Sequence, residues 1–234
     1  MSKKEHWLVV IAGPNGAGKS TFYNNILKSD PLFKNAPFVN LDNYAKEMAG
    51  SDGNPDDYFS QAGRKVIETI HSHFEKKKSF VYETTSSGTT HLRMMEAAKS
   101  KGYKIATIFI GLSRVELSHL RVKQRVGEGG HNVPAEDIER RYPKVIKNFP
   151  DMLARSDLAA VFDNSGKDPY KLIFLMDKYH FRIFYSYPRW VNTAMKGRKT
   201  SKGFIFLNAN DLKKDTKMQQ LKKITDELFK NFKE

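Results

Sequence analysis

The 234-residue sequence contains no cysteine. This absence excludes disulfide bonds, thiolate zinc sites and a cysteine nucleophile, and it fits a reducing compartment. Long hydrophobic runs are also absent, because no segment approaches the ~18 apolar residues of a membrane-spanning helix. The apolar stretch near the N-terminus is shorter than the hydrophobic region of a signal peptide. We therefore expect a cytoplasmic protein that does not act at a membrane.

Acidic residues are scarce relative to basic ones. The chain carries 40 Lys and Arg against 26 Asp and Glu, a formal net charge of +14 at pH 7. Such an excess is typical of proteins that bind nucleic acids or anionic membranes. Here the charge is spread along the chain, and no RNA-binding pattern of aromatic and basic residues appears. A polyanionic small-molecule substrate is the explanation we favour, and nucleic acid is the less favoured partner.

One strong motif stands near the N-terminus. Residues 13–20 read GPNGAGKS and fit G-x-x-x-x-G-K-[ST] at every position. The apolar run 6–12 before the motif is typical of a buried strand, and residues 21–28 after it have helical spacing. A glycine loop between a strand and a helix lets backbone N–H groups surround a phosphate. The expected phosphate loop comprises Gly13, Pro14, Asn15, Gly16, Ala17, Gly18, Lys19, Ser20 and Thr21.

Two side chains of this loop have predictable roles. Lys19 is expected to reach the β- and γ-phosphates of a nucleoside triphosphate, and the Ser20 hydroxyl is expected to bind Mg²⁺. Because the flanking strand and helix supply the context that the motif needs, a chance match in a glycine turn is the weaker interpretation. The sequence therefore predicts that the protein binds a nucleoside triphosphate.

Strands and helices alternate along the chain, which favours an α/β fold with a mostly parallel sheet covered by helices on both faces. The expected strands are 6–12, 38–41, 79–82, 104–112 and 158–162, with edge strands at 172–175 and 181–187. The expected helices are 21–28, 58–77 (Val66, Ile67, Ile70 and Phe74 buried), 92–100, 113–125 (opened by a Ser113–Glu116 capping box), one from 134 and 218–232.

Four polar side chains follow expected strands: Ser20, Asp42, Glu83 and Asp163. In open α/β sheets, ligands bind beyond the carboxyl ends of the strands, so these side chains are expected at one edge. A phosphotransferase needs a carboxylate to orient or deprotonate the acceptor hydroxyl. Asp42 is our first choice for this base, and a helix cap is its alternative role.

Glu83 has three possible functional roles, because it can bind the acceptor, assist Mg²⁺ or act as the base itself. A solvated strand end is the structural alternative. The hydroxyls of Thr84, Thr85, Ser86 and Ser87 suit a sugar or a phosphate, and they suit equally well the capping of the next helix. The residues alone leave these alternatives open.

Arginines between residues 121 and 141 predict a lid over the nucleotide. Arg121 and Arg125 are i,i+4 neighbours, and Arg140 and Arg141 lie across a glycine- and proline-containing turn. We expect Arg125 and Arg141 to stabilise charge on the transferring phosphoryl group, as arginine fingers do. Arg121 and Arg140 are interpreted as solvated helix surface. His131 in the turn is interpreted as structural or substrate-facing.

A set of short motifs is spread over roughly residues 6–166. They are 13–21, Asn40-Leu41-Asp42, Ala62-Gly63-Arg64, 79–85 (SFVYETT), Arg125-Val126, Gly129-Gly130-His131, Val133-Pro134, Arg141-Tyr142 and Asp163-Asn164-Ser165. In these motifs and in their order, the sequence resembles the zeta-toxin family of P-loop kinases, in particular its chromosomal branch of predicted ATPases. The first motif is shared by many NTPases, whereas the ETT segment and the GGH-x-VP lid are more specific.

The resemblance implies ATP- and Mg²⁺-dependent phosphorylation of the 3′-hydroxyl of the sugar in UDP-N-acetylglucosamine. It implies that Asp42 is the base, that Lys19 and Ser20 contact ATP and Mg²⁺, and that Arg125 and Arg141 clamp the phosphates. Arg64, Glu83, Thr84 and Thr85 would form the acceptor site, and Asp163 and Asn164 would lie near the adenine. The sequence departs from the family after Asp42. Relatives often carry an acidic residue directly after the aspartate, whereas here Asn43-Tyr44 and then Ala45-Lys46 follow.

We expect a kinase domain over residues 1–195 with its lid at about 121–145, followed by a basic linker and an amphipathic helix in 196–234. The apolar stripe of that helix most often signifies ordinary core packing, with antitoxin docking or self-association as alternatives. The alternative functions are a kinase for another nucleotide, a cofactor or a nucleic-acid end, and a regulatory ATPase. No hydrophobic strand ending in an Asp-Glu pair supports the ATPase.

Overall fold

The computed structural model describes residues 5–30, 33, 35–198 and 202–206. The helix expected at 218–232 and most of the segment 196–234 lie outside the described residues. The strands are β1 (Trp7–Ala12), β2 (Phe38–Val39), β3 (Phe80–Thr84), β4 (Lys104–Gly111), β5 (Leu158–Asp163), β6 (Lys171–Met176), β7 (His180–Ile183) and β8 (Gly203–Phe206).

The helical segments lie between the first five strands, except for α7, which follows β7. They are α1 (Lys19–Phe22), the π-helix η1 (Tyr23–Leu27), α2 (Leu41–Ala49), the 3-10 helix η2 (Pro55–Tyr58), α3 (Phe59–Glu75), α4 (Thr90–Ser100), α5 (Val115–Gly127), α6 (Ala135–Arg155) and α7 (Arg189–Met195).

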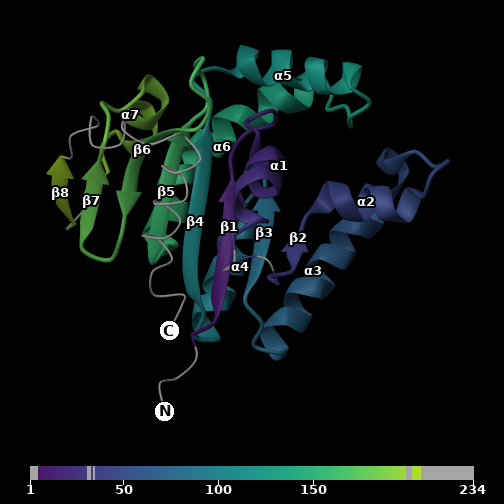
Figure 1. The fold of residues 1–234 in the computed structure, drawn as a ribbon, viewed down its shortest axis with the longest axis horizontal. Coiled ribbons are helices and arrows are strands. Elements are labelled where there is room, and N and C mark those ends of the chain that lie inside the picture. The colour runs from purple at the N-terminus through teal and green to yellow at the C-terminus, as the bar shows by residue number, and fades with distance from the viewer. Residues whose placement is uncertain (1–4, 31–32, 34, 199–201, 207–234) are drawn as a thin grey trace.

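The eight described strands form one sheet in the order β2-β3-β1-β4-β5-β6-β7-β8 (Figure 1). The pairs from β2 to β5 are all parallel, β6 runs antiparallel to both β5 and β7, and β8 is parallel to β7. The sheet is therefore mostly parallel with an antiparallel extension, which confirms the predicted α/β class. The carboxyl ends of β1 and β3 lie at one edge, where the phosphate loop follows β1.

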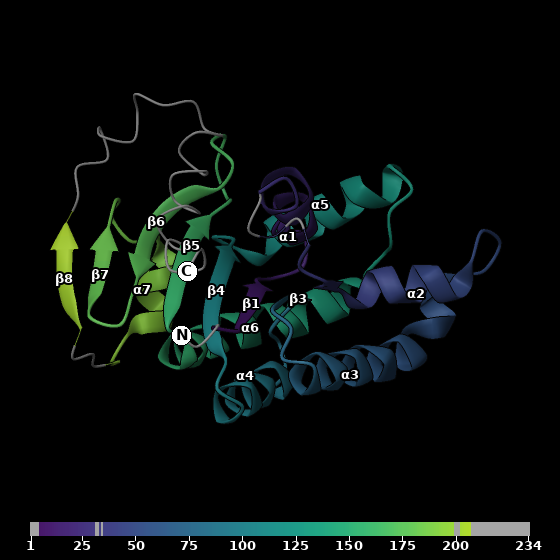
Figure 2. The ribbon, with the colours of Figure 1, turned by 60° about the horizontal axis from the view of Figure 1, so that its bottom comes forward.

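The alternating side chains of β1 divide the core into two layers. Leu8 and Val10 pack with α3, α4 and α6, whereas Val9 and Ile11 pack with α1 and η1. Figure 2 shows α3, α4 and α6 on one face of the sheet and α1 on the other. Because β1 is buried on both faces, its sequence is a continuous apolar run instead of an alternating one.

Several local predictions were wrong. The second strand ends at Val39, and Leu41 and Asp42 belong to α2, which Asn40 caps by accepting a 2.9 Å hydrogen bond from the Asn43 N–H. Helix α5 begins at Val115 without a side-chain cap, so the Ser113–Glu116 capping box does not form. In α3, Ile67 is 46% exposed, since it lies outside the stripe of Val66, Ile70 and Phe74.

The region after β5 differs most from the prediction. The segment expected as an edge strand at 172–175 is interior, because β6 pairs on both sides. Strand β7 ends at Ile183 instead of residue 187, and α7 and β8 were not predicted. These elements have short apolar runs whose pairing partners are set by the rest of the sheet, which local periodicity does not report.

Candidate active site

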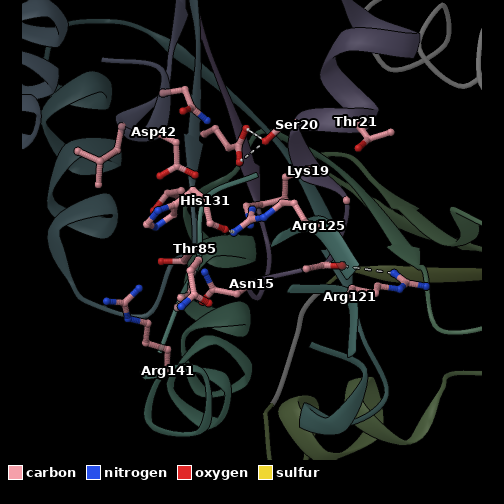
Figure 3. Close-up of a pocket in the computed structure, with 18 of the residues that line it drawn as sticks. Asn15, Lys19, Ser20, Thr21, Asp42, Thr85, Arg121, Arg125, His131 and Arg141 are labelled. Atoms are coloured by element: carbon pink, nitrogen blue, oxygen red, sulfur yellow. Dashed lines mark hydrogen bonds between the residues drawn. The ribbon is translucent and has the colours of Figure 1, made fainter. Parts of the chain in front are cut away.

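A cavity of about 740 Å³ opens at the carboxyl edge of the parallel strands. It lies among the phosphate loop, the start of α2, the end of β3, α5 and the start of α6, and its size is that of a small-molecule site. The predicted site residues that line it are Asn15, Gly16, Gly18, Lys19, Ser20, Thr21, Asp42, Glu83, Thr84, Thr85, Arg125, Arg141 and Asn164. Figure 3 shows labelled side chains of this cavity, among them Lys19, Asp42 and Arg125, which come from separate elements.

Glycine is required at two positions that shape the phosphate loop. Gly13 has φ +147°, and a Cβ there would lie 2.1 Å from the Ile110 carbonyl oxygen in β4. Gly18 has φ +88°, a left-handed conformation that side chains other than glycine rarely adopt. The loop is thus held tightly against the sheet, with Gly13, Pro14 and Ala17 behind the cavity surface.

Lys19 is a buried cation in the wall of the cavity. It is 7% exposed, and its ammonium donates a 3.0 Å hydrogen bond to the Pro14 carbonyl oxygen. Burial lowers the Lys19 pKa, the carboxylates of Glu83 and Asp42 oppose this shift, and Arg125 adds to it. A desolvated cation beside another cation is favourable only when anions lie near, so the site is electrostatically suited to phosphate groups.

Ser20 and Glu83 are joined directly. The Ser20 hydroxyl lies 2.9 and 3.1 Å from the two carboxylate oxygens of Glu83 (Figure 3). Burial raises the Glu83 pKa, Lys19 and the hydrogen bonds from Ser20 and Asn40 oppose the shift, and Asp42 adds to it. The two residues meet because Glu83 pairs in register with Ile11 on β1, the strand that leads into the phosphate loop.

The Ser20–Glu83 pair fits Mg²⁺, which prefers hydroxyl, carboxylate, phosphate and water oxygens. Among the described residues, no three or more His, Cys, Asp or Glu side chains gather into a metal-binding group. A cation held here would need further oxygen ligands, which phosphate groups and water supply to Mg²⁺ in phosphoryl-transfer sites.

Asp42 lies in the first turn of α2, across the cavity from Lys19. Its charge acts on the pKa of both Lys19 and Glu83, and Figure 3 shows the carboxylate directed into the cavity. The capping role considered for this stretch belongs to Asn40, which leaves the Asp42 carboxylate available to a ligand.

The lid turn between α5 and α6 is anchored across the cavity. His131 Nδ1 lies 2.8 Å from Asp56 Oδ1, and its ring contacts the Phe59 ring edge to face at 4.8 Å between centroids. Arg125 donates a 2.7 Å hydrogen bond to the His131 carbonyl oxygen, and its buried Nε has no hydrogen-bond partner among the described residues. Arg125 is therefore held over the cavity with a donor to spare.

Helix α6 contributes a second arginine. Arg141 lies 2.8 Å from Asp137, which also pairs with the exposed Arg140. The hydrogen bond from Arg140, opposed by burial and aided by Arg141, lowers the Asp137 pKa. Of these three residues, Arg141 and Asp137 line the cavity and Arg140 does not, so the interpretation of Arg140 as helix surface agrees with its exposure.

Three residues lie elsewhere than the sequence indicated: two predicted site residues lie outside the cavity, and one residue interpreted as helix surface lies in it. Arg64 is exposed on α3 and does not line the cavity. The Asp163 carboxylate accepts hydrogen bonds from Trp190 Nε1 (2.6 Å) and from the Ser165 N–H (2.9 Å), and it lies off the cavity surface. Arg121, interpreted as solvated surface, instead donates to the Asn164 carbonyl oxygen at 2.5 Å.

Sequence reasoning did not select Asp56, Phe59 or Tyr170, which all line the cavity. A weak signal existed for the first two, because Asp56 lies in the polar stretch 51–57 and Phe59 is the first residue of α3, which follows it. Nothing local marked Tyr170, which reaches the phosphate loop from the connection between β5 and β6. The missed residues are those whose role depends on contacts far along the chain.

The parallel strand order, the glycine loop and the buried lysine define a P-loop protein with an α/β fold. The family described as AAA domain matches residues 8–142, more than half of the 234, and the chain belongs to this family. A Haemophilus influenzae protein described as uncharacterized is 31% identical over 147 residues, which cover 61% of this chain and all of that protein.

Two solved structures share the fold. AvrRxo1-ORF1:ORF2 with ATP superposes with a TM-score of 0.62 and 16% identity, over 74% of this chain and 59% of that chain. This chain thus spans less than two thirds of that protein. A structure of the PezAT chromosomal toxin–antitoxin system of Streptococcus pneumoniae superposes with a TM-score of 0.56 and 16% identity, over 98% and 89%. None of the helices in the described part of the chain is long and apolar enough to cross a membrane.

Proposed function

We propose that the protein is an ATP-dependent, zeta-toxin-type kinase that phosphorylates a hydroxyl of a sugar nucleotide resembling UDP-N-acetylglucosamine. The observation that carries the proposal is the placement of Asp42 in the same cavity as Lys19, with the arginine lid above them. A phosphoryl donor site and a carboxylate base that share one cavity are what a small-molecule kinase requires. The likeness to AvrRxo1-ORF1, solved with ATP, supports ATP as the donor.

In this mechanism the Asp42 carboxylate accepts the proton of the acceptor hydroxyl. The hydroxyl oxygen forms a bond to the γ-phosphorus while the bond from that phosphorus to the β–γ bridging oxygen breaks, and ADP leaves. Lys19 and Arg125 neutralise charge on the transferring group, and Arg141 does so after exchanging its Asp137 partner for a phosphate oxygen. Interactions of this kind each contribute about 10²–10³-fold in rate.

Mg²⁺, when bound, neutralises charge on the β- and γ-phosphates. Ser20 and Glu83 would hold it, since the hydroxyl and the carboxylate lie within 3.1 Å of each other. This contact favours the metal-assisting role of Glu83 over its roles as base or acceptor ligand. Asp42 then remains the candidate base.

The acceptor would occupy the part of the cavity bounded by η2, α3 and the lid turn. Thr84 and Thr85 offer hydroxyls there, Asn132 offers an amide, and Phe59 and Tyr82 offer apolar ring surface. A sugar nucleotide matches this mixture, because its sugar hydroxyls need hydrogen-bond partners and its base needs an aromatic or apolar surface. Arg64, which the resemblance implied in the acceptor site, has no part in this arrangement.

The test is ATP consumption with and without UDP-N-acetylglucosamine, with the sugar nucleotide followed by mass spectrometry. We expect a mass gain of one phosphoryl group for the wild-type protein and none for Lys19→Ala. ATP loss without this product would contradict the proposed acceptor, and the search would turn to other nucleotides, cofactors and nucleic-acid ends.

The likeness to PezAT also supports a toxin role, with an antitoxin protein as partner. Induced expression in a bacterial host is the corresponding test. Growth arrest by the wild-type protein but not by Lys19→Ala is the expected result, and equal growth of both strains would contradict the toxin role.

A further inference from the structure

Side chains from distant parts of the chain engage three successive carbonyl groups of the phosphate loop. Asn164 Nδ2 donates to the Ala17 oxygen at 2.9 Å, and the Tyr170 hydroxyl donates to the Gly18 oxygen at 2.9 Å. Arg121 lies 3.4 Å from the Gly16 oxygen and bonds more closely, at 2.5 Å, to the Asn164 carbonyl oxygen. All three donors lie on the side of the loop that faces α5 and the β5–β6 connection.

Tyr170 is held in a costly backbone conformation. Its φ of 56° lies in the left-handed region, which a residue with a bulky side chain seldom adopts. The Tyr170 N–H donates to Asn164 Oδ1 at 3.0 Å, and the ring packs edge to face on Phe22 at 5.2 Å. Strain of this kind persists where the surrounding contacts determine the conformation, and it concentrates at functional sites.

Gly18 is fitted to these two side chains. A Cβ at this position would lie 2.7 Å from the Tyr170 hydroxyl oxygen and 3.0 Å from Asn164 Nδ2. The loop and the β5–β6 connection therefore approach each other closely only because residue 18 has no side chain. The close contact therefore limits which residues can stand at position 18 and how the Tyr170 and Asn164 side chains can lie.

The geometry of the peptide unit gives this contact a consequence for ligand binding. In a planar trans peptide, the C=O of one residue and the N–H of the next point in opposite directions. Holding the Ala17 and Gly18 carbonyls on the outer side directs the N–H groups of Gly18 and Lys19 toward the inner side. Those are N–H groups with which a phosphate loop binds a phosphate.

We propose that Tyr170 and Asn164 are positioning residues that fix the phosphate loop in its anion-binding conformation before the nucleotide arrives. Both lie beyond residue 142, where the family match ends. The proposal rests on the proposed function only in that the loop binds a nucleotide phosphate. Preorganisation of this kind raises affinity, because the loop does not have to be ordered when the ligand binds.

Helix α7 supports the same contact from behind. Trp190 Nε1 donates to the Asp163 carboxylate at 2.6 Å and thereby fixes the residue that precedes Asn164. The Trp190 ring in turn packs on Gly111, where a Cβ would lie 2.2 Å from it. The C-terminal part of the fold is therefore connected to the phosphate loop through Trp190, Asp163 and Asn164.

The test compares Tyr170→Phe with the wild-type protein in its affinity for two probes, ATP and inorganic tripolyphosphate, each with Mg²⁺. Phenylalanine keeps the ring contact with Phe22 and removes only the hydroxyl. Tyr179→Phe is the matched control, because Tyr179 is 63% exposed in the turn between β6 and β7. Asn164→Ala is the stronger variant, since it removes the bonds to both Ala17 and Tyr170.

We expect Tyr170→Phe to lower the binding affinity for ATP and for tripolyphosphate by the same factor, about three- to tenfold, which is the usual effect of one lost hydrogen bond. Asn164→Ala should weaken both probes by more than about tenfold. The melting temperature of Tyr170→Phe and its KM for the acceptor should stay at the wild-type values. A merely structural role would lower the melting temperature without this selective loss.

Two results would overturn the proposal. Weakened ATP binding with unchanged tripolyphosphate binding would place Tyr170 at the base or ribose instead of the phosphate loop. Unchanged binding of both probes would show that the loop keeps its conformation without the hydroxyl. Since the assay measures binding, a wild-type protein that binds both probes but phosphorylates no sugar nucleotide would contradict the proposed function and leave this test valid.

Discussion

The Ser20 hydroxyl lies 2.9 Å from one carboxylate oxygen of Glu83 and 3.1 Å from the other, although 63 residues separate them in the sequence. The contact joins the phosphate loop to the adjacent strand β3. We propose that this hydroxyl and this carboxylate would hold Mg²⁺, with Glu83 as the acidic residue of the metal site. Glu83 would serve there although no hydrophobic strand of the sequence ends in an Asp-Glu pair.

Replacement of Glu83 by glutamine is expected to raise the Mg²⁺ concentration needed for half-maximal phosphoryl transfer by about tenfold or more, because the cation loses its one protein carboxylate. Titration of activity with Mg²⁺ measures the effect, and Glu68→Gln on the exposed face of α3 is the control. An unchanged Mg²⁺ requirement would contradict the metal-binding role and would favour a role of Glu83 in binding the acceptor.

The same pair predicts a pH dependence. Burial raises the Glu83 pKa above its usual value, so the carboxylate takes up a proton at a higher pH than an exposed glutamate does. Protonated Glu83 does not bind a cation, and the apparent Mg²⁺ affinity of the apoprotein should therefore fall as pH decreases through the raised pKa. Mg²⁺ titrations from pH 8 downward check this, and Glu83→Gln should lack the transition.

Asp42→Asn is expected to keep ATP affinity within about threefold and to lower the turnover number by about 10²–10⁴-fold, since an amide cannot accept the acceptor proton. Separate measurement of ATP binding and of product formation distinguishes the two effects. Asp57→Asn, at an exposed position outside the cavity, serves as the control. Near-normal turnover of Asp42→Asn would remove it as the base.

Gly130→Ala is expected to displace Arg125, because a Cβ at residue 130 would lie 2.4 Å from Arg125 Cγ and 2.8 Å from its carbonyl oxygen. A shift of about 1 Å in a catalytic group costs roughly 10²-fold in rate, so turnover should fall by about one to two orders of magnitude. Gly127→Ala is the control, since nothing lies within 4 Å of its Cβ position. Equal turnover of the two variants would argue against a catalytic role for Arg125.

His91 predicts an acid-sensitive stability outside the active site. Burial, aided by Arg155, lowers its pKa to about 4, and its Nε2 has no hydrogen-bond partner in the described part of the chain. The unfolded state binds the proton more tightly, so stability is lost as pH falls from about 6.5 toward 4, by up to about 3 kcal/mol. Chemical denaturation at pH 7 and pH 4.5 should show that His91→Leu is less acid-sensitive than the exposed-site control His71→Leu.

Much of the architecture was predictable because it is locally encoded. Strands β1 and β4 are continuous apolar runs, and helix α3 has an apolar stripe, so period and length identify them without knowledge of their partners. The weaker elements β7, α7 and β8 are short, and their stability comes from pairing and packing instead of pattern. The boundary at Asp42 was misplaced because Asn40 caps the helix, which therefore begins two residues earlier than a helix capped by Asp42.

The sequence by itself determined the phosphate loop, because a strand, a glycine turn and a helix that bind a phosphate are contiguous in the chain and need no distant partner. It also identified the carboxylates and arginines that are candidates for the catalytic and ligand-binding roles. Only the tertiary structure decided among them. The order of the strands places Glu83 beside Ser20, and Arg64 lies on a face of α3 that does not line the cavity. Asn164 and Tyr170 reach the phosphate loop through contacts that span 147 and 152 residues of the sequence. Such contacts depend on how the sheet closes, and local periodicity carries no information about that.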